Sequence, residues 1–125
     1  MFNTLIVDDS DAFRQSLHQI LARSFPSMNI VEAADGEAAF LCLRTCRPDL
    51  VFMDIRMPGA NGLDITKAIK SVLADTRVCV ITSYDLQEYR DAALSCGADH
   101  FIVKDKLTTT EIAAIVDDIL SHRQD

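Results

Sequence analysis

The chain has 125 residues, of which 49% are hydrophobic and 25% charged, and its formal net charge at pH 7 is −7. These values are typical of one soluble globular domain, placed at residues 1–125, and the acidic balance argues against nucleic-acid binding through a basic surface. No apolar run approaches the roughly 18 residues of a membrane span, and the N-terminus lacks the features of a signal peptide, so we expect a cytoplasmic protein that binds no membrane.

Short continuous apolar runs alternate with apolar residues at helical spacing along the whole chain. The continuous runs predict five strands, centred on residues 4–7, 30–31, 49–54, 78–81 and 101–103. The helical spacing predicts a helix after each strand, over residues 13–21, 39–46, 65–73, 86–95 and 112–120. The fourth of these helices has few large apolar residues, so little burial energy would fix its position, and Gly97 is expected to end it. Thr108 and Glu111 have the spacing of a capping box at the start of the last one.

This succession of strand–helix units predicts the fold class. Strands that are apolar without alternation are covered on both faces of their sheet. Repeated units with right-handed crossovers give a parallel sheet with helices on both sides. We therefore expect an α/β fold, a doubly wound five-stranded parallel sheet in three layers.

Polar side chains stand at the carboxyl ends of four predicted strands, the edge at which open parallel sheets bind ligands. Asp8 and Asp9 follow the first strand, Asp54 ends the third, Thr82 the fourth and Lys104 the fifth. Each has an ordinary structural explanation when taken alone, such as capping of the first helix by the aspartates. Scattered surface polarity would not select one edge, so a functional site is the better interpretation.

Three carboxylates in one crevice repel one another, by roughly 1 kcal/mol per pair at 4 Å in water and about 4 kcal/mol at an effective dielectric constant of 20. Lys104 supplies only one positive charge. A hard divalent cation, Mg²⁺ (or Mn²⁺), would offset the rest. Asp54 is then either a metal ligand or a nucleophile, since carboxylates can accept phosphoryl groups. Lys104 and Thr82 are the groups available to hold the product.

The remaining metal-ligand residue types give no such pattern. The cysteines do not have the spacing of a metal site and are interpreted as small hydrophobic core residues: Cys42, Cys46, Cys79 and Cys96. The histidines are interpreted as structural or surface residues without a phosphohistidine or metal role: His18, His100 and His122.

The chain resembles, over essentially its whole length, the receiver domains of two-component response regulators, the CheY-like superfamily. The matching segments are "VDDS" (7–10), "ADGEAA" (34–39), "MDIRMPGANG" (53–62), "VITS" (80–83) and "GADHFIVKD" (97–105). Ser83-Tyr84 and the segment "GADHFIVKD" resemble the receivers of NarL/FixJ-like regulators, which precede helix-turn-helix output domains. The resemblance implies the flavodoxin-like strand order 2-1-3-4-5.

The resemblance also implies roles for individual residues. Asp54 would accept a phosphoryl group from a sensor histidine kinase, a phosphotransfer protein or a small phosphodonor. Asp8, Asp9, Asp54 and the backbone carbonyl of Arg56 would form the Mg²⁺ site. Thr82 would be the switch hydroxyl, Lys104 the phosphate-binding amine and Phe101 the aromatic switch residue. Such a domain is a signalling phosphoacceptor rather than an enzyme, although it promotes its own phosphotransfer and dephosphorylation.

Two positions depart from the pattern of the family. Asp105 stands where the family often has a proline after a cis peptide bond, which leaves the geometry after Lys104 open. Phe101 lacks the hydroxyl of the commoner tyrosine, so a switch there would act by packing alone.

Arg56 and Tyr84, each two residues beyond a site residue, are expected to overhang the phosphoryl group and obstruct water.

The output is expected at a face made by the helix over 86–95, the fifth strand, which would be a sheet edge, and the last helix. Phosphorylation would strengthen self-association or the binding of an output domain there.

The alternative function is a Mg²⁺-dependent phosphatase of the haloacid-dehalogenase-like class. That class needs a second aspartate where this chain has Arg56, and a cap insertion. A flavin-binding module would need a phosphate loop rich in Ser, Thr and Gly after the first strand, which the sequence lacks.

Overall fold

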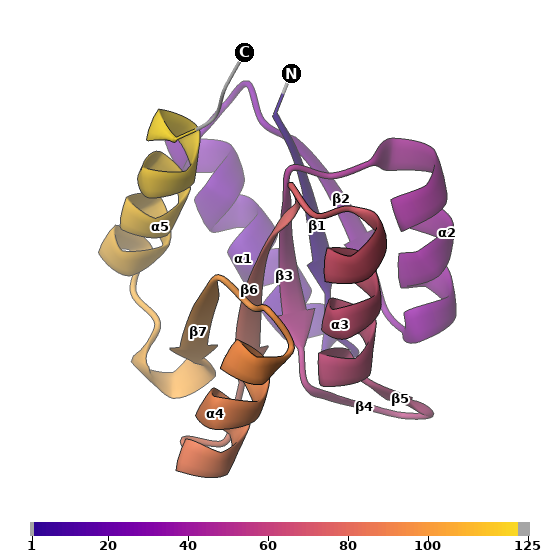
Figure 1. The fold of residues 1–125 in the computed structure, drawn as a ribbon. Coiled ribbons are helices and arrows are strands. Elements are labelled where there is room, and N and C mark those ends of the chain that lie inside the picture. The colour runs from indigo at the N-terminus through magenta and orange to yellow at the C-terminus, as the bar shows by residue number, and fades with distance from the viewer. Residues whose placement is uncertain (1, 123–125) are drawn as a thin grey trace.

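Five parallel strands form the central sheet of the computed structural model, which describes residues 2–122 (Figure 1). In chain order they are β1 (Asn3–Val7), β2 (Asn29–Ala33), β3 (Leu50–Asp54), β6 (Arg77–Thr82) and β7 (His100–Val103). Their order across the sheet is β2-β1-β3-β6-β7, which confirms the predicted order 2-1-3-4-5 and places β7 at an edge. Every neighbouring pair is parallel.

Helices cover both faces of this sheet and give the three predicted layers (Figure 1). They are α1 (Asp11–Ser24), α2 (Gly36–Cys46), α3 (Gly62–Val72), α4 (Gln87–Ser95) and α5 (Thr109–Ser121). One hydrophobic cluster joins the sheet to α2, α3 and α4, and a second joins it to α1 and α5. The central strand serves both, since Met53 belongs to the first cluster and Phe52 to the second. This double burial explains why β3 is continuously apolar.

Side chains cap the starts of four helices. Ser10, rather than Asp8 or Asp9, accepts a hydrogen bond from the first turn of α1. Asp35, Asn61 and Thr108 do the same for α2, α3 and α5. Such a cap typically contributes about 1 kcal/mol, because it satisfies a backbone N–H that has no partner within the helix.

Helix α4 is the exception. It begins without a side-chain cap, and Ala93 is its one buried residue. Gly97, with a φ of 93°, follows its last turn, where a left-handed residue is expected. With no cap and little buried apolar area, α4 is the least firmly held of the described helices, as its sequence predicted.

Two short elements were not predicted from the sequence. A hairpin of two-residue strands, β4 (Arg56–Met57) and β5 (Ala60–Asn61), follows β3. A 3₁₀ turn, η1 (Lys104–Lys106), follows β7. Apolar periodicity cannot reveal elements this short.

The cysteines are all free thiols, but only Cys79 is fully buried. Cys42, Cys46 and Cys96 are partly exposed, so their interpretation as core residues was too simple. None of the described helices has the length and apolar character needed to cross a membrane.

Candidate functional site

The carboxylates of Asp8, Asp9 and Asp54 meet beyond the carboxyl ends of β1 and β3. Ligand oxygens from all three lie within 4.8 Å of one another. The pairing of Val7 with Met53 in adjacent strands brings the following residues, Asp8 and Asp54, to the same level of the sheet. Asp8 is fully buried, Asp54 is 5% exposed, and Asp9 is exposed. The site therefore has a protected interior and one carboxylate at its mouth.

Lys104 reaches the same site from the end of β7. Its Nζ atom lies 2.6 Å from Asp8 Oδ2 and 3.8 Å from Asp54 Oδ2, and its side chain is largely buried. The ammonium group also lies 4.5 Å from the centre of the Phe13 ring. One positive charge thus faces three carboxylates, which leaves a negative excess within the cluster.

Burial and the neighbouring negative charge both act on the pKa of Asp54. Burial, and next the charge of Asp8, raise the pKa of Asp54 to about 7, although Lys104 acts in the opposite direction. Each unit of such a shift corresponds to about 1.4 kcal/mol against the charged form. A cation bound at this point would favour the ionised carboxylate.

The donor atoms fit a hard divalent cation. Only carboxylate oxygens converge in the cluster, and oxygen is the ligand that Mg²⁺ prefers. Asp8 Oδ1 accepts a hydrogen bond from the Ser10 N–H at 2.8 Å. Asp8 Oδ2 is buried and has the Lys104 charge beside it, but it accepts no hydrogen bond of normal geometry. The Lys104 ammonium is thus its partner in this structure, and a second lone pair of the oxygen remains for a metal. Arg56, whose carbonyl is the fourth expected ligand, begins β4 just beyond Asp54.

The two expected switch residues lie on the neighbouring strands. Thr82 ends β6 and is buried, and its hydroxyl oxygen accepts a hydrogen bond from the Tyr84 N–H at 3.1 Å. Phe101 lies in the edge strand β7 and is half-buried. The Arg90 guanidinium of α4 lies 4.6 Å from the centre of its ring. Phe101 therefore joins the edge strand to the weakly held helix α4.

Arg56 and Tyr84, expected to overhang the site, approach each other. The Arg56 guanidinium lies 5.1 Å from the centre of the Tyr84 ring, within the range of a cation–π contact. The Tyr84 ring in turn meets the Tyr89 ring edge-on, with 6.1 Å between their centres. No peptide bond between described residues is cis, so the chain passes from Lys104 to Asp105 through a trans bond.

Two residues that hold the site were not identified from the sequence. Gly62 is one, because a Cβ atom there would fall 1.8 Å from the Asp54 carbonyl oxygen. The Asn61-Gly62 dipeptide was a signal that this backbone needed a small residue. Arg14 is the other: its guanidinium donates to the Asp8 backbone carbonyl at 2.6 Å and to Glu32 at 3.0 Å. Only the packing of α1 against β2 reveals that pair.

The histidines have other neighbours. His18 Nδ1 lies 2.8 Å from Glu32 Oε2, and His122 lies beside Asp118. His100 begins β7, at the opposite end of that strand from Lys104. Their interpretation as structural or surface residues agrees with these positions.

Comparisons with known proteins agree on one family. The model of the response regulator receiver domain matches residues 4–117. The transcriptional regulatory protein LnrK of Bacillus subtilis is 34% identical over 93% of this chain and 53% of its own length. The probable transcriptional regulatory protein NarL of Mycobacterium tuberculosis is 35% identical over 90% of this chain and 52% of its own length. The chain thus spans about half the length of these curated relatives.

Solved structures show the same likeness. The signal receiver domain of a DNA-binding response regulator from Colwellia psychrerythraea superposes with a TM-score of 0.92 and 27% identity, covering 98% of this chain and 100% of that one. The receiver domain of the putative response regulator NarL from Mycobacterium tuberculosis superposes with a TM-score of 0.87 and 34% sequence identity, covering 98% of each chain.

Proposed function

The chain belongs to the response regulator receiver family, and from this premise we propose that Asp54 is the residue that accepts the phosphoryl group. Receiver domains of this family are signalling components of two-component systems. Neither the family match nor the relatives support a haloacid-dehalogenase-like phosphatase or a flavin-binding module. The observation that carries the proposal is the cluster of Asp8, Asp9 and Asp54 with the Lys104 ammonium beside it.

The proposed transfer uses groups that the site brings together. A carboxylate oxygen of Asp54 attacks the phosphorus atom of the donor, and the bond from phosphorus to the donor's nitrogen or oxygen breaks. The leaving atom keeps the electron pair of that bond. Lys104 and the Thr82 hydroxyl bind oxygens of the transferred group, so that Asp54 carries a mixed anhydride. Attack by water on the phosphorus later returns inorganic phosphate and the free carboxylate.

The metal part of the proposal rests on the donor set. Asp8, Asp9, Asp54 and the Arg56 backbone carbonyl would hold Mg²⁺ or Mn²⁺. Bound there, the ion would offset negative charge on the phosphoryl oxygens during transfer. The surplus of three carboxylates over the single Lys104 charge supports this assignment, because clustered carboxylates cost free energy unless cations offset their charge.

We assign the donor role to a sensor histidine kinase or a phosphotransfer protein in the cytoplasm, and the output to the face formed by α4, β7 and α5. Movement of the Thr82 hydroxyl towards the phosphoryl group would release the Tyr84 N–H. Phe101 could then turn inward, away from Arg90. Because α4 is weakly attached, this rearrangement costs little free energy. The changed face would favour self-association or the binding of an output domain.

Phosphorylation by a small acyl phosphate tests the proposal. With Mg²⁺ present, the protein should carry at most one phosphate per chain and should not hydrolyse a small phosphate ester, whereas a phosphatase would turn over repeatedly on that ester. Asp9→Ala and excess EDTA should each abolish the gain. Asp75→Ala, at an exposed aspartate at the opposite edge of the sheet from the carboxyl ends of β1 and β3, is the matched control and should behave as the wild type. Undiminished phosphorylation in EDTA would overturn the metal assignment.

A further inference from the structure

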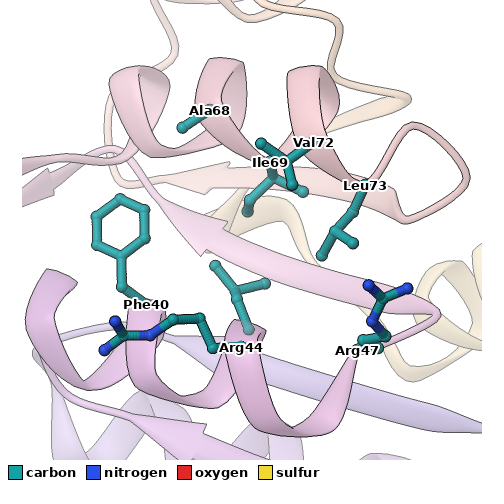
Figure 2. Close-up of a pocket in the computed structure, with 8 residues that line it drawn as sticks. Phe40, Arg44, Arg47, Ala68, Ile69, Val72 and Leu73 are labelled. Carbon is teal, nitrogen blue, oxygen red and sulfur yellow. The ribbon is translucent and has the colours of Figure 1, made fainter.

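An apolar groove of about 470 Å³ lies between α2 and α3 (Figure 2). Phe40 and Leu43 line it from α2, and Ile69 and Val72 line it from α3. Val72 is 79% exposed and Phe40 is 43% exposed, which is unusual for large apolar side chains that face each other across a surface groove. The groove therefore presents apolar area that the described chain does not cover.

Two arginines of α2 accompany this apolar surface. Figure 2 shows the Arg44 guanidinium towards the Phe40 end of the groove and the Arg47 guanidinium towards the Leu73 end. Neither has an acidic partner within residues 2–122, and no acidic residue lines the groove. Two unpaired guanidiniums beside apolar surface are notable in a chain with a net charge of −7.

Arg47 also has an unfavourable backbone conformation. Its φ is 45°, and it is the one residue other than glycine with a positive φ in the part of the chain that the structure describes. It ends α2, a position at which glycine is usual because it has no Cβ. Compared with glycine, arginine at this position places a guanidinium beside the groove but strains the backbone.

We propose that the α2–α3 groove binds an amphipathic helical segment of a partner protein, with large apolar side chains in the groove and carboxylates against Arg44 and Arg47. A helix lying in a groove between two helices is a common mode of peptide recognition. Guanidinium groups bind carboxylates in a directed, bidentate manner, so they would fix the orientation of the segment. The charge of the groove thus selects an acidic partner, and two arginines are too few for nucleic acid.

This site is separate from the phosphorylation site. Asp54 ends β3, at the carboxyl edge of the sheet. Arg47 lies just before β3 begins, and Val72 ends α3, which starts beside Asp54 and runs away from it. The end of the groove that carries Arg47 is therefore at the opposite edge of the sheet, and binding should not require a phosphoryl group on Asp54.

Fluorescence anisotropy with synthetic peptides tests the inference on the intact chain. The probe is a labelled helix of about 16 residues with leucines at i, i+4, i+7 and i+11 and glutamates beside them. A second peptide has lysine at every glutamate. The acidic peptide should bind more tightly than the basic one by about tenfold or more, and equally well to the wild type and to Asp54→Asn.

Variants of the groove locate the binding. Val72→Asp should raise the dissociation constant of the acidic peptide by about tenfold or more. Arg44→Gln combined with Arg47→Gly should raise it by about tenfold. Arg47→Gly relieves the backbone strain, so a loss of binding there cannot be ascribed to unfolding. Leu41→Asp and Arg23→Gln, at exposed positions that do not line the groove, are the matched controls and should bind as the wild type does.

Three results would overturn the inference. They are the absence of binding by either peptide, equal binding of the basic peptide, and unchanged binding by Val72→Asp. Self-association of the free protein that Val72→Asp abolishes would also contradict it, because the occupant would then be a second copy of the chain.

Discussion

Gly62 packs directly against the backbone of Asp54, so closely that a Cβ atom at residue 62 would fall 1.8 Å from the Asp54 carbonyl oxygen. The Gly62 N–H also donates to the Ile55 carbonyl at 2.7 Å. The first turn of α3 is thereby fixed onto the end of the strand that presents the proposed phosphoacceptor. No side chain fits between them, so the backbone of Asp54 can hold this position only if residue 62 is glycine.

Gly62→Ala should therefore displace Asp54. We expect a loss of roughly 1–3 kcal/mol in the free energy of unfolding, since a methyl group is forced into packed backbone. The rate of phosphorylation should fall at least tenfold, because misplacement of a reacting group by about 1 Å can cost about a hundredfold. Gly59→Asn is the control: Gly59 has open space around it, and asparagine tolerates its positive φ. A Gly62→Ala protein phosphorylated at the wild-type rate would refute the role of this contact.

The raised pKa of Asp54 predicts how stability depends on pH without a divalent cation. The pKa is about 7 in the folded protein against 3.8 for the free group, so the folded state holds the proton over this window. The free energy of unfolding should thus decrease from this group as pH rises from about 4 to about 7. Asp54→Asn lacks the penalty, and it should be more stable than the wild type by roughly 2 kcal/mol at pH 8. A three-unit shift, in which the attraction to Lys104 is already included, corresponds to about 4 kcal/mol, and relaxation of the site around the charged carboxylate reduces this penalty.

Denaturant unfolding in EDTA across this pH range measures the difference. Asp75→Asn, at an exposed carboxylate, should parallel the wild type at every pH. Addition of Mg²⁺ should stabilise the wild type by mass action, more than it stabilises Asp54→Asn. Parallel pH profiles for the wild type and Asp54→Asn would contradict the raised pKa.

The contact between Arg56 and Tyr84 predicts the lifetime of the phosphorylated state. The two side chains meet at 5.1 Å, and both extend from residues just beyond the site. If they obstruct the attacking water, Arg56→Ala combined with Tyr84→Ala should shorten the half-life of the aspartyl phosphate several-fold. Release of inorganic phosphate from protein freed of phosphodonor measures it, with Arg23→Ala as the control for removal of an exposed arginine. A half-life that is unchanged or longer in the double variant would show that the pair does not protect the phosphate.

Coupling to the output face predicts where amide exchange changes. Beryllofluoride, a mimic of the phosphoryl group, should alter exchange within residues 84–106, because Thr82 and Phe101 both contact groups leading into α4. Thr82→Ala should bind the mimic and show a smaller change. Hydrogen–deuterium exchange read by mass spectrometry distinguishes the outcomes. Changes confined to α1 and α2 would argue against coupling through α4, β7 and α5.

Much of the fold could be predicted from the sequence because its strands are buried on both faces. Continuous apolar runs such as residues 50–53 have no other explanation in a chain this short, and strand order then followed from the resemblance to a family. The hairpin of β4 and β5 could not be predicted, because two-residue strands have no periodicity. Helix α4 was recognised as weakly apolar, and the structure adds a second reason for its weak attachment, since no side chain caps its start.

Some residues of the candidate site could be predicted from the sequence, and others could not. Asp8, Asp54 and Lys104 end strands, so the rule that parallel strands present their carboxyl ends at one edge was enough to group them. Arg14 could not be placed, because its role depends on the way a helix packs on the sheet. Gly62 was part of a motif, but its function is to leave space, and a sequence does not show which atoms fill it.

The most direct test of the account is to locate the phosphate on the protein. Wild-type protein is incubated with a small acyl phosphate and Mg²⁺, the aspartyl phosphate is trapped by borohydride reduction, and the modified residue is identified by peptide mass spectrometry. The account predicts a single modified site, at Asp54, and no modification of Asp54→Asn. Reduction at Asp8 or Asp9 in place of Asp54, or full modification of Asp54→Asn, would contradict it.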